Sequence, residues 1–319
     1  MAQLQHVVRP AQSLFPVAQK AQEPAFEHLV FPYQLAVPFL FLIGAYVQAK
    51  KALYRFFGGR TCIPNTNFWL VDWISINSRR VRDGAAKWLA LDAVYNFRNG
   101  EGANWIVRAF DSYWMHIRNA QAVRNRLGIV KRELVGAILK VSKTKTGGEP
   151  VRILSLAAGS GQGVIEVLAD MRRAGVHCEV MLVDQDGTAL AHAHQLAKQH
   201  GVSDMITTRE GNVIAFKREL HGSRPDIIEM CGLTDYLEDN LAIALIKRIY
   251  HYLQPDGFFL TCHIHPNAEA YFLWHVVNWG MLYRTRKQLR NLLIAGDFLD
   301  PKLFTEPHRI HSVAVAQKV

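Results

Sequence analysis

The chain has 319 residues and is 50% hydrophobic, which is enough for a sizeable core and for either two domains or one catalytic domain with an accessory segment. Its 37 basic and 27 acidic residues give a net charge of +10 with neutral histidines, so either the surface is simply basic or the protein meets an anionic partner. The basic residues are scattered and form no recognisable nucleic-acid module, so we expect no nucleic-acid partner.

The cysteines give no sign of a disulfide or of a zinc site. Their spacing contains no Cys-x-x-Cys pair and no metal-ligand pattern, which predicts reduced thiols in a cytoplasmic protein. We therefore predict no bound metal. The four cysteines are Cys62, Cys178, Cys231 and Cys262.

The first 27 residues lack periodicity and hold no long apolar core, so we expect an arm without a cleavable signal peptide. The next segment, Leu29 to Val47, is nearly long enough to cross a bilayer and is followed by Lys50, Lys51 and Arg55. Two prolines, a glutamine and a glycine inside it argue against a continuous lipid-facing helix. We expect a buried cap over the active site. An interfacial anchor and a spanning helix are the alternatives, so membrane association is not favoured.

From Asn67 to Lys140 apolar residues recur at threes and fours, which predicts helices. Residues 99–102 interrupt the pattern, and residues 143–148 form a basic, glycine-ended linker. Residues 1–145 are therefore expected to form an all-α cap, and residues 146–319 an α/β domain.

An aromatic cluster lies in this helical part. Most of its rings are expected to be core, because helical spacing buries aromatic residues on one face. One or two rings are candidates to roof a ligand, since a π face attracts a cation, and we choose Tyr113 and Trp114 for this substrate-binding role. Nearby, Arg118, Arg124 and Arg126 are expected to be solvated, with a bidentate contact to a ligand carboxylate as the alternative.

The most informative stretch runs from Ile153 to Gly163, an apolar strand that leads into a glycine-rich turn before a helix. Glycines remove side chains where a ligand approaches the backbone, and a helix N-terminus favours an anionic group. The apolar run Glu179 to Val183 then ends in Asp184, where a second parallel strand would present a carboxylate to a ribose. Together these features predict a cofactor that contains adenosine.

Later elements decide between cofactors. The stretch Arg209 to Val213 is followed by the strand Asp226 to Met230, by a Leu-Gln-Pro-Asp-Gly turn before the strand Phe258 to Cys262, and by a helix from Thr285 to Phe298. This order resembles the class I S-adenosylmethionine (SAM)-dependent methyltransferases, from about Val151 to the C-terminus. The resemblance implies an α/β fold with a Rossmann-like, seven-stranded sheet covered by helices on both faces. It also implies SAM as the cofactor.

The resemblance assigns cofactor contacts. The turn after the first strand would approach the methionine moiety, Asp184 the ribose, Gln185 the adenine edge, and Asn212 with Val213 the adenine ring. Ser155 stands where the family usually has an acid, so the grip on the aminobutyrate ammonium must come from elsewhere. Ala157 and Asn212 also depart from the family pattern. The predicted cofactor-binding set is Ser155, Ala157, Gly159, Ser160, Gly161, Asp184, Gln185, Asn212, Val213, Met230 and Cys231.

Ligands of such sheets lie beyond the carboxyl ends of the strands, so the residues after the fourth and fifth strands are candidates for the acceptor site. A histidine has the right pKa range for a base, although two histidines spaced by two could equally fill a polar wall. A base is optional, because alignment makes the main contribution to methyl transfer. The candidates for substrate binding are Thr234 and Asp235, and the candidates for catalysis are Tyr236, His263 and His265.

We therefore expect a methyltransferase that acts on a small molecule, with the N-terminal helices as its lid. One alternative is an enzyme that also uses SAM but breaks a bond on the aminobutyl side of its sulfur. Nicotianamine synthases and azetidine-carboxylate synthases share this fold, attack the aminobutyl side and release methylthioadenosine, and the missing first-strand acid motivates this reading. The remaining alternatives are a membrane-associated lipid methyltransferase, an NAD-dependent dehydrogenase and a non-enzymatic RNA-binding scaffold.

Overall fold

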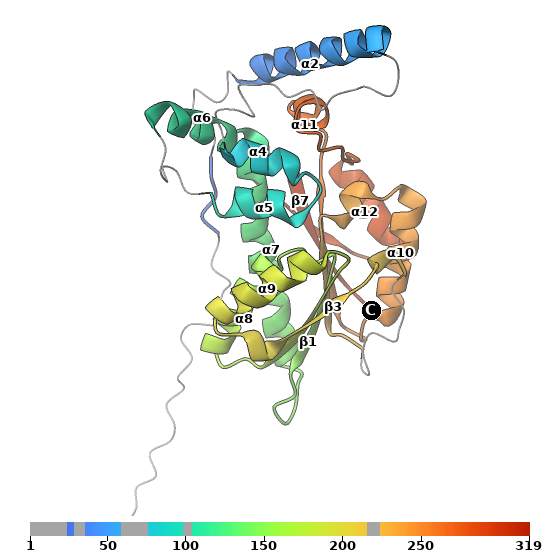
Figure 1. Cartoon of the computed structure of the whole chain (residues 1–319). Coiled ribbons are helices and arrows are strands. Elements are labelled where there is room, and N and C mark those ends of the chain that lie inside the picture. Colours follow the sequence, from blue (N-terminus) through green and yellow to red (C-terminus); the bar gives the residue numbers. More distant parts are fainter. Residues whose placement is uncertain (1–23, 29–35, 59–75, 98–103, 216–223) are drawn as a thin grey trace, which may run out of the picture.

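The computed structural model describes residues 24–28, 36–58, 76–97, 104–215 and 224–319 (Figure 1). Its strands form one seven-stranded sheet in the order β3-β2-β1-β4-β5-β7-β6. The first five strands are parallel, whereas β7 runs antiparallel to both β5 and β6. The predicted Rossmann-like sheet is confirmed. The strands are β1 (Val151–Leu156), β2 (Cys178–Asp184), β3 (Ile206–Glu210), β4 (Ile227–Cys231), β5 (Phe258–Ile264), β6 (Lys302–Thr305) and β7 (His311–Gln317).

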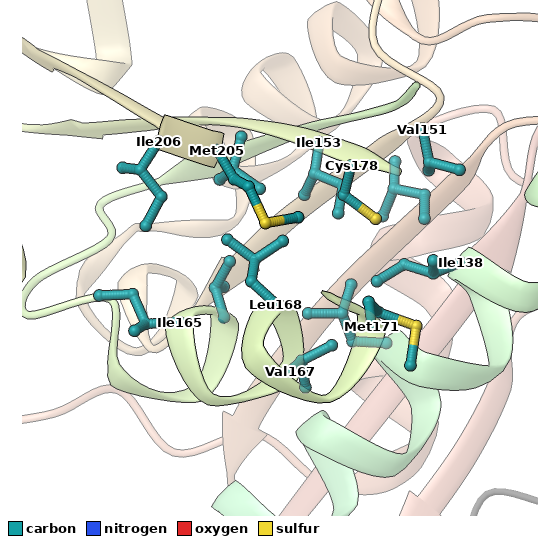
Figure 2. Close-up of a cluster of buried hydrophobic side chains, with 14 of the residues drawn as sticks. Ile138, Val151, Ile153, Ile165, Val167, Leu168, Met171, Cys178, Met205 and Ile206 are labelled. Atoms are coloured by element: carbon teal, nitrogen blue, oxygen red, sulfur yellow. The ribbon is translucent and has the colours of Figure 1, made fainter. Parts of the chain in front are cut away.

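Helices cover both faces of the sheet. One face carries α7 (Arg118–Ser142), α8 (Gln162–Arg173) and α9 (Gly187–Gln199), and the other carries α10 (Asp239–Tyr252) and α12 (Arg286–Ala295). Side chains alternate along a strand, so β1 contributes Ile153 to the first core and Leu154 to the second. Figure 2 shows part of the first core, where Leu168 and Met171 of α8 lie under the strands.

Local sequence signals start several of these helices. Asp186 caps α9, because its carboxylate accepts a hydrogen bond from the Thr188 N–H at 2.9 Å. Thr285 and Gln288 form a capping box at the start of α12. Gly161, which precedes α8, has a φ of +62°, and a Cβ added there would lie 2.9 Å from Leu182 Cδ1. Both its backbone conformation and the close approach of β2 therefore require glycine at this position.

A helical region precedes the sheet, as predicted. It contains α2 (Ala36–Gly58), α4 (Ile76–Asp83), α5 (Trp88–Tyr95) and α6 (Trp105–Met115), which share a core with α7 and with α11 (Ala270–His275). The last helix before the sheet, α7, also packs against α8 and β7, so it belongs to both parts of the molecule. The domain boundary near residue 145, which falls between α7 and β1, stays a prediction.

The helix α2 begins inside the segment that we expected to cap the active site. Leu40, Ile43 and Val47 are buried against α11, but other large side chains of α2 are exposed. The expectation was a buried cap over the active site, but α2 packs on α11 with one face only and none of its residues lines the cavity described below, while residues 29–35 of the segment lie outside the described residues. Within the described ranges, no helix has the length and hydropathy that a bilayer crossing requires.

Two leucines test this placement of the core. Leu168 of α8 is fully buried, whereas Leu241 of α10 is 39% exposed. Leu168→Ala should lower the free energy of unfolding by about 2–5 kcal/mol, because it leaves a cavity in a packed core. Leu241→Ala should change it by less than about 1 kcal/mol. Urea denaturation followed by circular dichroism measures both, and equal losses would contradict the assignment.

Candidate active site

A cavity of about 630 Å³ lies at the carboxyl ends of the parallel strands, between the sheet and the helical region. The residues that follow β1, β2, β3 and β4 form one side of it, and α4, α5, α6, α7 and α11 contribute to the other. At this place β1 pairs with β2 on one edge and with β4 on the other, so the chain crosses over in opposite directions. Such switch points are where open α/β sheets bind ligands, and the volume suits a small-molecule site.

The turn after β1 presents backbone to the cavity. Ala157, Gly159 and Gly161 have φ values of +52°, +56° and +62°, so the chain folds back tightly here. The predicted turn residues, which include Ser160, all line the cavity, as do the first residues of α8. The N–H groups of a first helical turn have no partner within the helix, so this end of the cavity favours an anionic ligand group.

Asp184, at the end of β2, stands beside this turn and lines the cavity. One carboxylate oxygen accepts a hydrogen bond from the Gly159 N–H at 2.8 Å, and the other accepts one from the Asp186 N–H at 2.9 Å. A carboxylate has about four acceptor sites, so two remain for neighbouring hydroxyl groups. The geometry fits the predicted contact to a ribose.

The residues predicted to contact the adenine follow β2 and β3. Gln185, Asn212 and Val213 all line the cavity. The side-chain oxygen of Asn212 accepts a hydrogen bond from the Ile214 N–H at 2.9 Å, which fixes the direction of the amide. Val213 is buried and offers an apolar surface, which suits a flat ring.

The helix α5 closes this end of the cavity. The indole N–H of Trp88 donates to the hydroxyl of Thr188 at 3.1 Å, and its ring packs against His192 with the centroids 4.6 Å apart. The side chains of Asn96 and Gln162 exchange two hydrogen bonds of 3.0 and 3.1 Å. The helical region is thus joined to α8 and α9 on both sides of the glycine turn. The sequence marks Trp88 only as part of an apolar helix pattern.

A carboxylate missing from β1 is present on β4. Ser155 of β1 is in register with Glu229 of β4, and its hydroxyl donates to the Glu229 carboxylate at 2.5 Å. Glu229 lines the cavity, whereas Ser155 is fully buried behind it. Burial raises the pKa of Glu229, and the hydrogen bond from Ser155 and the charge of Arg126 oppose that rise. The one sequence signal for this role is an acidic residue within an otherwise apolar strand.

The rest of β4 divides between the core and the cavity. Cys231 lines the cavity as predicted, but the side chain of Met230 is fully buried in the second core. Of the predicted cofactor-binding residues, Ser155 and Met230 therefore do not reach the cavity, although Ser155 acts on it through Glu229.

The other end of the cavity is apolar. Trp114 of α6 stacks on Phe272 of α11, with the ring centroids 5.4 Å apart and the planes 2° apart, and both residues line the cavity. Tyr113 packs edge-on against Trp114 but is not part of the lining. Further apolar residues of the lining are Val81, Leu91, Val94, Met115, Ile117, Ile264, Leu273, Val277, Trp279 and Met281.

A buried polar network lies behind this apolar end. Asp235 lines the cavity, and one of its carboxylate oxygens lies 2.9 Å from Nδ1 of His263 and accepts a hydrogen bond from the Ile264 N–H at 3.0 Å. The hydroxyl of Thr234 donates to the Cys262 carbonyl at 2.9 Å. Thr234 and His263 are buried and do not line the cavity, so they hold Asp235 in place from behind.

The remaining catalytic candidates differ in position. His265 is bonded outside the cavity, with Nδ1 2.6 Å from the Arg284 carbonyl and Nε2 2.7 Å from the Ser312 hydroxyl. Tyr236 lines the cavity, and its hydroxyl accepts a hydrogen bond from the Trp279 indole at 2.6 Å. Burial raises the pKa of Tyr236 to about 12, so the phenol stays neutral at physiological pH. The catalytic roles of Tyr236, His263 and His265 stay predictions, and among these three only Tyr236 reaches the cavity.

Arg126 of α7 lies in the cavity wall, contrary to the expectation that it is solvated. It is 5% exposed and donates to the Tyr95 hydroxyl at 2.8 Å. None of the ion pairs between described residues includes it, although an arginine stays charged when buried. Arg124 is not solvated either, since its guanidinium forms an ion pair with Glu27 at 2.5 Å.

His311, the first residue of β7, also lines the cavity. It is 2% exposed, and neither ring nitrogen has a hydrogen-bond partner in the described part of the chain. Burial lowers the pKa of His311 well below its ordinary range, and the charge of Arg126 adds to this effect. The imidazole is therefore neutral at physiological pH. Sequence reasoning missed His311, because nothing near it in the chain marks a site.

Among the described residues, no three histidine, cysteine, aspartate or glutamate side chains gather as metal ligands do. The described cysteines, Cys178, Cys231 and Cys262, are free thiols, and Cys62 lies outside the described residues.

Comparison with known proteins identifies the family. The family described as "Putative methyltransferase" matches residues 78–318, and the chain belongs to it. The protein is a SAM-dependent transferase. No curated protein matches the chain.

Solved structures share the fold at low sequence identity. A possible exported protein from Bordetella parapertussis is 17% identical, with a TM-score of 0.60 over 76% of this chain and 86% of that one. The CurJ carbon methyltransferase is 14% identical, with a TM-score of 0.53 over 79% of this chain and 68% of its own. The CMeT domain of the citrinin polyketide synthase is 18% identical, with a TM-score of 0.50 over 71% of this chain and 58% of its own.

The carboxylate of Asp184 allows a test of cofactor binding beside the glycine turn. Asp184→Asn should weaken the binding of S-adenosylhomocysteine about 10- to 100-fold, because hydrogen bonds to a charged group contribute about 1.5–3 kcal/mol. Isothermal titration calorimetry measures the affinity. Asp297→Asn, at an exposed aspartate that pairs with Lys247, is the matched control and should bind as the wild type does. Equal affinities in all three proteins would contradict the assignment.

Proposed function

We propose that this methyltransferase transfers the methyl group of SAM to a small acceptor that has an apolar body and an acidic oxygen. The observation that carries the proposal is a single cavity with two chemically different ends. The glycine turn and Asp184 lie at one end. Apolar side chains line the other end, together with the buried side chains of Arg126 and His311. Such a site suits a polar cofactor and an acceptor that is mostly apolar.

The residues at the first end fit SAM. Asp184 would accept from the ribose hydroxyls, Asn212 and Val213 would contact the adenine, and the turn from Ala157 would lie along the methionine moiety. Glu229 supplies the acid that the resembling family usually carries on its first strand, so it would accept hydrogen bonds from the aminobutyrate ammonium. Its buried position makes such a contact strong, because charges interact more strongly away from water.

When bound, SAM supplies an electrophilic methyl group whose leaving thioether needs no proton. The chain then has to align the acceptor with that methyl group and exclude water, and alignment can contribute roughly 7–11 kcal/mol. Trp88 and Asn96 join the helical region to α9 and α8, which would help to hold the two ends of the cavity in one geometry.

The second end suits an acidic oxygen. Arg126 is a buried cation that no described carboxylate pairs with at close range, so an anionic group in the cavity would offset the cost of its burial. His311 is buried, neutral and without hydrogen-bond partners among the described residues, so a ring nitrogen can accept a hydrogen bond from a hydroxyl group. Because its lowered pKa makes His311 a weak base, transfer of that proton to the ring requires an acidic hydroxyl whose anion pairs with Arg126. Together they would bind the acceptor oxygen and stabilise its deprotonated form.

The alternatives lose much of their support. Attack on the aminobutyl carbon was motivated by the missing first-strand acid and the aromatic-rich cap, and the carboxylate of Glu229 beside Ser155 offers an acid for that role. Because the chain belongs to a methyltransferase family, we no longer interpret it as a dehydrogenase or as an RNA-binding scaffold.

The product of the cofactor separates the remaining chemistries. Mass spectrometry of the protein incubated with SAM and a fractionated cell extract should detect S-adenosylhomocysteine together with an acceptor heavier by one methylene unit. Incubation with SAM alone should leave it intact. Methylthioadenosine formed without an acceptor would contradict methyl transfer and establish attack on the aminobutyl carbon.

The proposed roles of His311 and Arg126 lead to a separate prediction. His311→Asn should lower kcat/KM by roughly 100- to 10,000-fold, the usual contribution of a positioned base, while its affinity for S-adenosylhomocysteine stays within about twofold of the wild type. Arg126→Met should raise the KM for the acceptor. Because the pKa of His311 lies below its ordinary 6.5, the wild-type kcat/KM should decrease on acidification only at pH values below 6.5.

The exposed histidine variant His251→Asn serves as the control and should keep full activity. If either His311→Asn or Arg126→Met lost cofactor affinity instead of acceptor turnover, the residue would belong to the cofactor end, and the proposed acceptor chemistry would be wrong.

A further inference from the structure

Large hydrophobic side chains are exposed mainly at one end of the molecule. Trp105 and Ile106 of α6 and Trp274 of α11 are 71%, 43% and 48% exposed. Figure 1 shows α2, α6 and α11 together at this end. The helix α2 contributes most of the exposed apolar side chains, namely Phe39, Phe41, Leu42, Tyr46, Leu53, Tyr54, Phe56 and Phe57.

The helix α2 is apolar on both faces. Its inner face packs on α11, where a Cβ added at Gly44 would lie 2.6 Å from the Tyr271 ring, and Gln48 and Lys51 bond to His275 at 2.6 and 3.2 Å. Its opposite side, the outer face of α2, consists of Phe39, Leu42, Tyr46, Leu53 and Phe57, which recur at helical spacing. A helix that is hydrophobic all round is normally covered on every side.

The charges of α2 indicate what covers the outer face. The helix contains Lys50, Lys51 and Arg55 and no acidic residue. The chain as a whole has a net charge of +10. Apolar side chains flanked by basic residues on a helix that lies along a surface are the combination that binds an anionic membrane interface.

We propose that the outer face of α2 docks on an anionic lipid surface, with Phe57 and the adjacent, exposed Phe56 entering the apolar layer and Lys50 and Arg55 contacting the headgroups. This is binding in the plane of the interface, because α2 does not meet the requirements for crossing a bilayer. The proposal rests on the exposed end of the molecule and does not depend on the acceptor chemistry of the cavity.

A second copy of the chain fits this face less well. In a two-fold pairing of α2 with itself, Lys50, Lys51 and Arg55 would find no acidic residue on the partner helix, because α2 contains none. An anionic lipid surface has the complementary charge.

The location also gives the docking a functional consequence. The helix α11 lies between the two features: α2 packs on it, and its Phe272 and Leu273 line the apolar end of the cavity. One helix therefore separates the lipid surface from the acceptor end, so an apolar acceptor dissolved in a membrane would have a short route to the site.

Flotation of the full chain with lipid vesicles tests the proposal. The wild type should float with vesicles that contain phosphatidylglycerol and much less with pure phosphatidylcholine, and added salt should weaken the binding because the contact is partly electrostatic. The double variant Phe56→Ser, Phe57→Ser and the double variant Lys50→Glu, Arg55→Glu should each bind at least about tenfold more weakly. The matched controls are Leu299→Ser, at a side chain 70% exposed outside this end, and Lys302→Glu on β6, and both should bind as the wild type does.

Binding of S-adenosylhomocysteine establishes that each variant is folded, since none of the changed residues lines the cavity. The proposal is overturned if the wild type does not float with anionic vesicles, or if the Phe56, Phe57 variant floats equally well. It is also overturned if sedimentation finds a wild-type dimer that this variant abolishes while lipid binding is unchanged, because the outer face of α2 would then be a contact between copies.

Discussion

The pairing of β1 with β2 on one side and β4 on the other is the constraint on which the site depends. The crossovers from these strands lie on opposite faces of the sheet, so their carboxyl ends cannot both be covered by the same helix, and a cavity remains. The turn from Ala157 to Gly161 lies at its floor, and Asp184 fixes that turn by accepting the Gly159 N–H. The helical region packs over the strand ends, where Trp88 bonds to Thr188.

The carboxylate on β4 lies next to the strand position where the resembling family usually has an acid. Ser155 and Glu229 occupy paired positions on parallel strands, so their side chains point to the same face and reach nearly the same place. Glu229 presents an acid to the cavity, and Ser155 satisfies one of its oxygens from behind. Since burial of an unpaired carboxylate is costly, the hydroxyl at position 155 matters even though it does not line the cavity.

Two helices link parts of the molecule that would otherwise be separate. Arg126 projects from α7, which also packs on the sheet, so the buried cation is held by the same core that holds β7 and His311. On α11, Phe272 stacks with Trp114 inside the cavity while α2 packs on the helix from outside. The apolar end of the cavity and the exposed aromatic end of the molecule therefore pack on the same helix.

The sequence alone determined the strand, turn and helix from Ile153 onward and the carboxylate of Asp184, because these rest on local patterns, and the family resemblance implied a seven-stranded sheet. Only the tertiary structure decided which long-range neighbours meet: Glu229 behind the turn, and Arg126 with His311 at the acceptor end. The spacing of His263 and His265 predicted a polar wall or a catalytic pair, but spacing cannot tell which way a side chain faces, and neither reaches the cavity. For the segment that contains the start of α2, the sequence predicted an apolar cap, whereas packing on α11 decided which face of the helix is covered. In each case strand register and helix packing join residues far apart in the chain, and no local pattern contains that information.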